Sequence, residues 1–502
     1  MSSALILSVI VILSSCCEGH KILVYSPKLF YSHFRFMGHI ADILAAARHD
    51  VVVLMPECDE RIKTNGTTLA RPMRANCSFD GLSELLSTLD DIWIINTGRM
   101  DFLFSMAWAL SSKENLICRG LLGDMELISR LRNEKFDLGI SEAFSFCGFG
   151  VFDKIGLQKH LSAFNTQLIE SMTEPYGINY NPSHVPALLS QSDDAMSFVE
   201  RMQNFIVFGT TYVLTRFIAV PHALLSFEEY IRRPFTIAES IEILARCSSV
   251  FVNTNILLES PRELNSKIAF IGGITATQSS SLSEDFKHLM DVSSGGVVLV
   301  SFGTAALSSR MPTNLKYVFV SVFRRFPEIT FIWKYELDDE VGSDLPNVIK
   351  RKWVPQAGLL FHKNMRAFVS QCGSNALSES VYAGVPIVCI PIFIDQMRNA
   401  RKLEKQHSAL VIHNRNFTAQ SLEVALRGVL YDKSYSISAR RVSAMVRDAI
   451  IPLEEQISGR ARIAIKMKKV ELLDAGYRKL NCLKFFYIDV ICIPLILIIL
   501  LS

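Results

Sequence analysis

The stretch AFVSQCGSNALSESVYAGVPIVCIPIFIDQMRNARKLEKQ, residues 367–406, alternates short apolar runs with segments of helical spacing. The runs Ala367–Ser370 and Val385–Pro391 are continuous and apolar, which is typical of parallel strands covered on both faces. The segments Asn375–Tyr382 and Gln396–Gln406 have the spacing of helices that connect such strands. This stretch therefore predicts an α/β fold with a doubly wound parallel sheet.

The same alternation continues in both directions along the chain. A length of 502 residues exceeds what one core usually holds. We therefore expect two doubly wound, Rossmann-like domains, residues 20–270 and 271–470, facing a cleft. They join near Gly272-Gly273, followed by a Ser/Thr-rich linker. Further strands are predicted at Lys21–Ser26, Val51–Met55, Ile92–Asn96, Phe136–Ser141, Ser249–Asn255, Gly296–Phe302, Ile329–Trp333, Val348–Trp353 and Ala409–Ile412, and further helices at Met37–Ala47 and Gln420–Tyr431.

Both ends of the chain are apolar. Residues 1–19 combine an apolar run with small residues and predict a secretory signal peptide, with a buried strand as the alternative. Residues 485–502 predict a C-terminal transmembrane helix of barely sufficient length, with a buried helix as the alternative. A third apolar segment, Phe205–Val220, predicts a buried helix; contact with a membrane or a lipophilic acceptor is the alternative.

Composition narrows the function. Apolar residues make up 49% of the chain and its net charge is only +3, which disfavours nucleic acid as a partner. Three Asn-x-Ser/Thr triplets, at Asn65, Asn76 and Asn416, are expected glycosylation sites of a lumenal protein. The eleven cysteines lack the spacing of metal ligands, and their pattern specifies no disulfide.

The turns that follow the predicted strands carry the candidate binding residues, because parallel sheets bind ligands at the carboxyl ends of their strands. Ser301, Gly303 and Thr304 follow one strand, and Gln371, Gly373, Ser374 and Asn375 lie between another strand and its helix. Backbone N–H groups at such a helix start suit a diphosphate.

Nearby residues suit the rest of a nucleotide sugar. Glu379 is placed to accept hydrogen bonds from ribose hydroxyls, and Trp353 with Gln356 can stack on a base and read its edge. Asp395 and Gln396, at a further strand-to-helix turn, can hold sugar hydroxyls. Each of these residues alone is more often structural, and their order on consecutive strand ends is what favours a binding site.

These blocks resemble the signature of the UDP-glycosyltransferases, most closely the animal UDP-glucuronosyltransferase type and its nematode members. The resemblance rests on Trp353–Gln356, Phe368–Asn375, Glu379, Ala383–Pro386 and Pro391–Gln396, and it extends to Ser301–Thr304, Phe251–Asn255 and Ile271–Ile274. It covers nearly the whole chain and is weakest over residues 452–480.

The resemblance implies a GT-B type fold, with the acceptor on the first domain and the UDP-sugar on the second. It implies an inverting, metal-independent transfer of glucuronic acid, or another hexose such as glucose, to a small lipophilic acceptor. No metal site or cofactor is expected besides the co-substrate, UDP-glucuronate or UDP-glucose, and no Asp-x-Asp triplet occurs. The implied location is the endoplasmic reticulum membrane, with one span, a lumenal body, and homo- or hetero-oligomers with related enzymes as possible assemblies.

The resemblance also assigns the chemistry. The family's catalytic base corresponds to His33, and its partner carboxylate to Glu142, where the family has Asp. The family's phosphate-binding His corresponds to Gln371, which can donate a hydrogen bond but carries no charge. Lys334 stands where the family often has Arg, and Ala376 replaces a hydroxyl residue. These departures leave a second reading open: a weakened, membrane-anchored homologue that binds UDP-sugar or lipophiles, or a hetero-oligomer partner.

Overall fold

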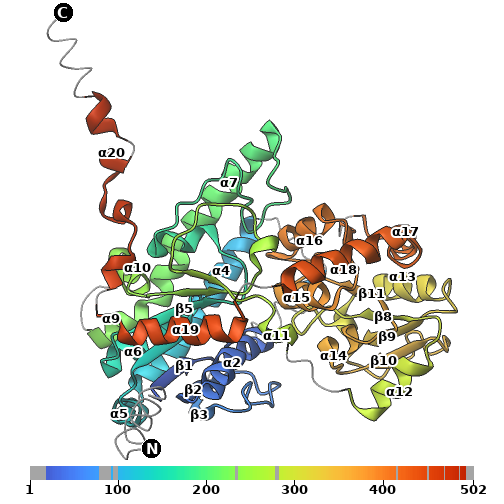
Figure 1. Ribbon diagram of the computed structural model, residues 1–502, viewed down its shortest axis with the longest axis horizontal. Helices are drawn as coiled ribbons and strands as arrows, with labels where there is room; N and C mark the ends of the chain where they lie inside the picture. The colour runs from blue at the N-terminus through green and yellow to red at the C-terminus, as the bar shows by residue number, and fades with distance from the viewer. Residues whose placement is uncertain are drawn as a thin grey trace, which may run out of the picture.

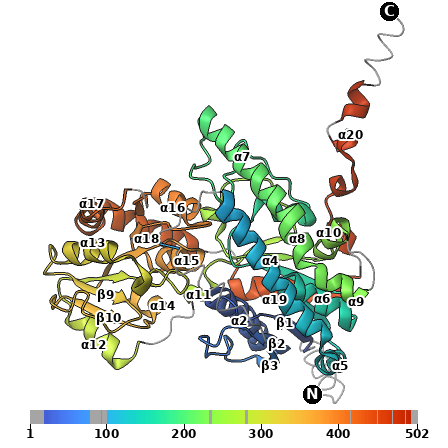
Figure 2. The ribbon, with the colours of Figure 1, turned by 180° about the vertical axis from the view of Figure 1, so that it is seen from behind.

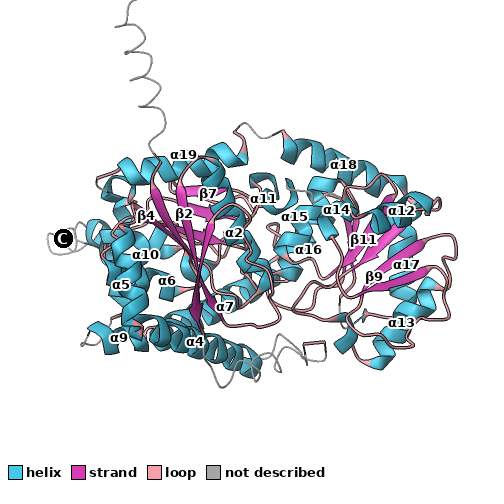
Figure 3. Ribbon diagram, turned by 90° about the horizontal axis from the view of Figure 1, so that it is seen from below, coloured by secondary structure: helices cyan, strands magenta, loops and turns pink. Residues whose placement is uncertain are grey.

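The computed structural model describes residues 19–77, 92–93, 100–231, 236–277, 282–413, 416–448, 451–468, 470–485 and 487–492. They form two α/β domains that lie side by side, each with a central sheet between layers of helices (Figures 1 and 3). The predicted pair of doubly wound domains is confirmed.

The first domain has a parallel sheet in the order β3-β2-β1-β4-β5-β6-β7. Its strands are β1 Lys21–Tyr25, β2 Asp50–Glu57, β3 Arg71–Asn76, β4 Leu138–Glu142, β5 His160–Phe164, β6 Val250–Val252 and β7 Ile268–Phe270. Its helices are α2 Tyr31–Ala46, α4 Met100–Gly123, α5 Met125–Glu134, α6 Phe146–Ile155, α7 Phe198–Leu214, α8 Val220–Ala223, α9 Leu225–Ile231, α10 Ile237–Ala245 and α11 Ile274–Thr277.

The second domain has a parallel sheet in the order β10-β9-β8-β11-β12-β13. Its strands are β8 Val297–Val300, β9 Thr330–Lys334, β10 Val348–Arg351, β11 Met365–Ser370, β12 Ile387–Cys389 and β13 Ala409–Val411. The helices that follow the first domain are α12 Glu284–Val292, α13 Thr313–Phe323, α14 Gln356–Leu360, α15 Ser374–Ala383, α16 Gln396–Lys405, α17 Ala419–Tyr431, α18 Lys433–Arg447, α19 Leu453–Lys466 and α20 Cys482–Phe485.

Both sheets are buried on both faces, which explains their continuous apolar strands. In β1, Leu23 and Tyr25 join one core cluster, whereas Ile22 and Val24 join the cluster on the opposite face. The strand β8 alternates between two clusters in the same way. Chemistry is thereby confined to the strand ends, because the faces are filled by packing.

Three strands of the first sheet, β3, β5 and β7, were not predicted. The edge strand β3 buries only Met73 and Ala75, so its sequence is mostly polar. In β5, the polar residues His160 and Ser162 are buried and hydrogen-bonded, which hides the apolar pattern. β7 is only three residues long. The strand predicted at Ile92–Asn96 lies mostly outside the described residues.

Helix α19 returns from the second domain to the first (Figure 1). Ile457, Ala461 and Ala464 enter the first domain's core beside α2. The range 271–470 predicted for the second domain thus includes a helix that packs on the first. The chain crosses between the domains twice, so the C-terminal segment fastens them together.

Helix α7 corrects the expectation of a buried helix at Phe205–Val220. It projects beyond the rest of the first domain (Figures 1 and 2), and Phe205 and Phe217 are 63% and 60% exposed. The helical stretch Phe198–Tyr230 is, among the described residues, the one that is long and apolar enough to cross a membrane, and none of its most apolar window is buried. In the ranges that the structure describes, no layer of helices or strands covers its outer side (Figures 1 and 2).

The termini are only partly described. The predicted signal peptide lies outside the described residues except for Gly19, and the predicted span lies outside them beyond residue 492. The described part of the C-terminal segment extends away from the domains (Figure 1), and Tyr487, Val490 and Ile491 are exposed. This part is not a buried helix, which was the alternative.

The packing of α19 yields a stability prediction. Ile457→Ala removes a fully buried side chain and is expected to lower the unfolding free energy by about 2–5 kcal/mol. Ile463→Ala, on the exposed side of the same helix, is the control and should change it little. Urea unfolding of both variants measures the difference. Equal midpoints would mean that α19 contributes nothing to the first domain's core.

Candidate active site

His33 and Glu142 meet at the carboxyl edge of the first sheet. His33 lies in the first turn of α2 and Glu142 is the last residue of β4. Imidazole Nδ1 lies 2.7 Å from Glu142 Oε1, and the same oxygen accepts a hydrogen bond from the backbone N–H of Asn165 at 3.1 Å. Since a carboxylate only accepts, Nδ1 carries the proton and Nε2 is left to accept one.

The surroundings of His33 adjust its basicity. Burial lowers the pKa of His33, but the carboxylates of Glu142 and Asp395 outweigh burial, so the pKa lies above its usual value. Asp395 belongs to the second domain, so both domains act on this imidazole. The rings of Phe30 and Phe144 flank His33 with centroids at 5.8 and 6.2 Å, which makes the neighbourhood of the base apolar.

The turns proposed for the diphosphate lie together. Gly303 has φ +75°, and a Cβ there would lie 2.7 Å from Gln371 Nε2, so Gln371 faces this turn closely. Gly373 caps the N-terminus of α15, whose first backbone N–H groups are free of helical partners. Cys372, between them, has φ +63° and is disulfide-bonded to Cys389 in β12. The disulfide fastens this turn to the neighbouring strand.

The residues proposed for the nucleoside also converge. Gln356 Nε2 donates to Glu379 Oε2 at 2.7 Å, and burial raises the pKa of Glu379 to about 7 against the opposing effects of Gln356 and Arg35. Trp353 is half exposed, and the edge of Tyr31 meets it at 5.0 Å between centroids. Tyr31 and Arg35 belong to α2 of the first domain, so that domain lies beside the residues proposed for the nucleoside.

Asp395 and Gln396 have different roles in the structure. Asp395 Oδ2 accepts from Ser374 Oγ at 2.9 Å and from Asn399 Nδ2 at 2.7 Å. Gln396 Oε1 instead accepts from the backbone N–H groups of Ile392 and Phe393. Asp395 is thus available to a ligand, whereas the carbonyl of Gln396 supports its own turn and only its amide nitrogen remains.

The side chain of Asn375, which the sequence proposed for the diphosphate, is hydrogen-bonded to the first domain. It donates to the carbonyl of Ser32 at 3.4 Å and accepts from Asn253 at 2.6 Å. Asn253 also donates to Asn165 at 2.8 Å, beside the Glu142 carboxylate. Asn375 therefore fixes the second domain against the segment that carries the base.

Lys334, proposed as a cation near the diphosphate, already has an acidic partner. Its ammonium pairs with Glu336 at 2.7 Å and lies 5.8 Å from the centroid of Trp353. Of the remaining predicted residues, Ser301 is buried, with its hydroxyl 3.5 Å from the backbone N–H of Gly303, and Thr304 is partly exposed in the same turn. Across the described part of the chain, no cluster of three metal-ligating side chains is present.

Among the sequons, Asn76 and Asn416 have exposed side chains and Asn65 is partly exposed. A second disulfide joins Cys58 to Cys77 beside Asn76. Sequence reasoning missed Tyr31, Arg35, Asn253 and Asn399. Asn253 follows β6, so it could have been found by the rule that ligands bind at strand ends. Tyr31, Arg35 and Asn399 lie within helices, where the sequence offered no such signal.

Similarity to known proteins identifies the family of this chain. The model of the family described as "UDP-glucoronosyl and UDP-glucosyl transferase" matches residues 20–498. The chain belongs to this family. It is accordingly a transferase enzyme that takes a sugar from a UDP-sugar, and its two domains form the GT-B fold.

Individual relatives agree with the family. The putative UDP-glucuronosyltransferase ugt-50 of Caenorhabditis elegans is 27% identical over 93% of this chain and 90% of its own length. The human UDP-glucuronosyltransferase 1A8 is 28% identical over 83% and 78%. Among solved structures, the calicheamicin glycosyltransferase CalG4 matches with a TM-score of 0.59 at 16% identity, covering 91% of this chain and 99% of its own. That likeness shows the shared fold.

The raised pKa of His33 gives a pH prediction. A protonated imidazole cannot accept a proton, so kcat/KM should rise with pH through the pKa of His33, above about 6.5. Glu142→Gln removes a carboxylate that raises this pKa. We expect the rising limb of the plot of kcat/KM against pH to move to lower pH, and kcat to fall by roughly 10²-fold. A pH–rate profile measures both, and an unmoved limb would assign it to another group.

Gln371→His restores a cation beside the diphosphate turn. We expect turnover to rise by about fivefold, because a charge-assisted hydrogen bond to the leaving group gains about 1 kcal/mol over a neutral one. Gln420→His, on an exposed helix position, is the control. Steady-state kinetics and UDP titration measure the effect. Weaker UDP binding in Gln371→His would mean that this turn does not hold the phosphates.

Proposed function

We propose that this enzyme transfers a hexose, glucuronate or glucose, from its UDP-sugar to a hydroxyl of a small lipophilic acceptor, with inversion at the anomeric carbon. The observation that carries the proposal is the pairing of His33 with Glu142 on one domain, within the electrostatic reach of Asp395 on the other. The proposed base thus lies within the electrostatic influence of a carboxylate from the opposite domain.

In the proposed reaction, the acceptor oxygen attacks the anomeric carbon from the face opposite UDP. His33 Nε2 takes the acceptor's proton, the new carbon–oxygen bond forms, and the bond from the anomeric carbon to the phosphate oxygen breaks as UDP leaves. Glu142 stabilises the imidazolium that results. The start of α15 stabilises the charge that UDP gains. Each step uses groups of this chain, and we propose that it needs neither a metal nor a cofactor.

The donor would lie along the second domain. We assign the uracil to Trp353 and Gln356, the ribose to Glu379, and the diphosphate to Gly303, Gln371 and the N-terminus of α15. Asp395 would bind the sugar. This assignment is supported by the convergence of these side chains at one edge of the second sheet, with α2 covering the nucleoside side.

The acceptor would lie against the apolar surroundings of the base. Phe30 and Phe144 offer aromatic surface beside His33. An apolar ring that packs there would bring its hydroxyl toward Nε2 and displace water from it. This supports phenol-like or other lipophilic alcohols as the acceptor class.

We place the enzyme in the endoplasmic reticulum membrane, with its body in the lumen and glycans on Asn65, Asn76 and Asn416. The two disulfides fit an oxidising compartment. The apolar end of the chain would supply the anchor. The exposed apolar stretch Phe198–Tyr230 supports a further contact with the membrane surface, and such a contact would place the acceptor site near a source of lipophiles.

The second candidate is a slow homologue that binds UDP-sugar, alone or as a partner of related enzymes. It is favoured by two observations: Gln371 carries no charge, and Glu336 neutralises Lys334. This candidate predicts UDP binding without turnover by the isolated chain.

The deciding experiment is product analysis by mass spectrometry, with mixed UDP-hexoses and a panel of phenols. We expect a glycosylated phenol from the wild-type protein and none from His33→Ala, while both bind UDP with similar affinity. His288→Ala, an exposed position on α12, is the control. Equal turnover by wild type and His33→Ala would refute the base assignment, and UDP binding without any product would favour the second candidate.

A further inference from the structure

Helix α16 carries a buried hydrogen-bonded link to the first domain. Gln167, three residues after β5, donates from Nε2 to Asn399 Oδ1 at 2.6 Å and accepts at Oε1 from Lys402 Nζ at 2.6 Å. Gln167 is 2% exposed and Asn399 is fully buried. Two residues of the second domain thus bind the nitrogen and the oxygen of one side-chain amide of the first domain.

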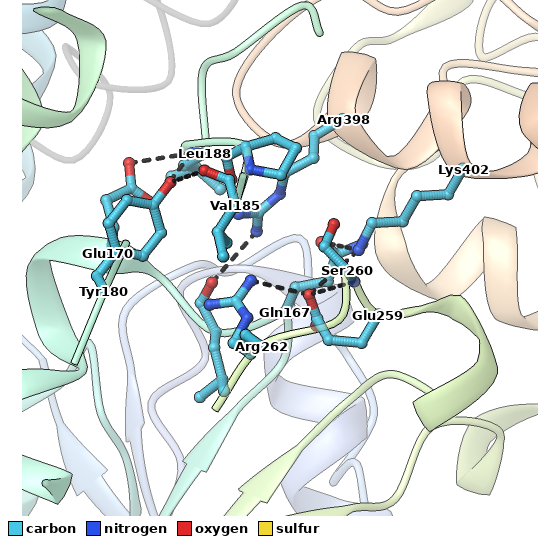
Figure 4. A network of polar contacts seen from close by, with 12 residues as sticks. Gln167, Glu170, Tyr180, Val185, Leu188, Glu259, Ser260, Arg262, Arg398 and Lys402 are labelled. Atoms are coloured by element: carbon cyan, nitrogen blue, oxygen red, sulfur yellow. Dashed lines mark hydrogen bonds and ion pairs between the residues drawn. The ribbon is translucent and has the colours of Figure 1, made fainter. Parts of the chain in front are cut away.

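The direction of this chain of hydrogen bonds is fixed by its ends. The amine of Lys402 donates, and Figure 4 shows it extending from its helix toward Gln167 and Glu259. Burial lowers the pKa of Lys402 to about 7 against the effect of Glu259, but an amine donates in either protonation state. At the other end, Asn399 Nδ2 faces two acceptors, the Asp395 carboxylate and the Cys372 carbonyl. Neither amide can turn over without setting donor against donor or acceptor against acceptor.

This series of hydrogen bonds ends at Asp395, the carboxylate that we propose binds the sugar. Asn399 and Ser374 both donate to Asp395 Oδ2. Within the described residues, Oδ1 has no hydrogen-bond partner, so it is the oxygen that remains for a sugar hydroxyl. Asn399 therefore fixes the rotation of the carboxylate, and Gln167 fixes Asn399.

The segment of residues 165–167 also contacts the pair formed by His33 and Glu142. The backbone N–H of Asn165 donates to Glu142 Oε1, and the side chain of Gln167 reaches Asn399. Residues 165–167 are thus bonded to the Glu142 carboxylate, which pairs with His33, and through Asn399 to the Asp395 carboxylate. A shift of this segment would change the distance between base and sugar.

We infer that Gln167 is an interdomain positioning residue, which orients Asp395 through Asn399 and so aligns the donor sugar with His33 when the domains are in contact. This inference rests on the proposed function. It assigns to the contact between the domains a role in placing the sugar rather than in binding the nucleotide. Trp353, Gln356 and Glu379, which we assign to the nucleoside, take no part in this series of hydrogen bonds.

Gln167→Glu in the full chain tests the inference, because the change keeps the shape of the side chain. The introduced carboxylate still accepts from Lys402, which preserves the interdomain contact, but it cannot donate to Asn399. Asn399 must then turn its nitrogen away from Asp395 or lose its partner. We expect kcat with the UDP-hexose to fall by about tenfold to hundredfold, with the Kd of UDP and the Tm close to those of wild type.

A double-mutant cycle separates positioning from general stabilisation. If Gln167 acts through Asn399, Gln167→Glu should change kcat by less than about twofold in an Asn399→Ala background. Gln167→Met, uncharged and of similar length, provides the same cycle if the carboxylate lowers the Tm. The control is Gln406→Ala, which removes another interdomain hydrogen bond, to the carbonyl of Leu257, without reaching Asp395.

Three outcomes would overturn the inference. The first is a kcat and KM of Gln167→Glu within about twofold of wild type, and the second is full additivity with Asn399→Ala. The third is an equal loss of kcat in Gln406→Ala, which would show that any interdomain contact has this effect. Failure of the proposed function is distinct, because wild type itself would then give no product from any UDP-hexose.

Discussion

The reaction of this enzyme depends on an alignment between two separate sheets. The proposed base His33 and its partner Glu142 belong to the first domain, and the residues proposed for the donor belong to the second. Since the faces of both sheets are filled by packing, the reacting groups can occupy only the strand ends. Productive geometry therefore rests on contacts between the domains, of which Asn375 to Ser32 and Gln167 to Asn399 lie nearest the chemistry.

Helix α19 supports this alignment, because it makes the polypeptide cross between the domains a second time. The chain forms the first domain, passes to the second, and returns so that Ile457 enters the first domain's core. Two crossings restrict the relative motion of the domains more than one linker would. Interdomain hydrogen bonds of single side chains such as Gln167 add to this restriction.

The architecture, and the closeness of most residues proposed for the site, were predictable from the sequence. Continuous apolar strands and the turns after them are local signals, so Gly303, Gln371, Gly373 and Asp395 were found together. What could not be predicted depends on distant segments. Gln167 and Asn399 are buried polar residues whose partners come from distant segments: Gln167 bonds to Asn399 and Lys402, and Asn399 also bonds to Asp395 and Cys372. The exposure of α7 likewise depends on the absence of a neighbouring layer on its outer side, which no local pattern encodes.

The departures at the diphosphate turn change how charge is stabilised there. A protonated histidine would meet the leaving group with a full charge, whereas Gln371 offers only an amide and Lys334 is already paired with Glu336. What remains is the N-terminus of α15, where the aligned peptide dipoles act as about half a positive charge. The disulfide from Cys372 to Cys389 holds this turn to β12. A rigid set of neutral donors can still bind a diphosphate, because donors that are already oriented need no reorganisation as charge develops. In the reaction we propose, fixed backbone geometry would thus stabilise the leaving group where the family resemblance implies a cation.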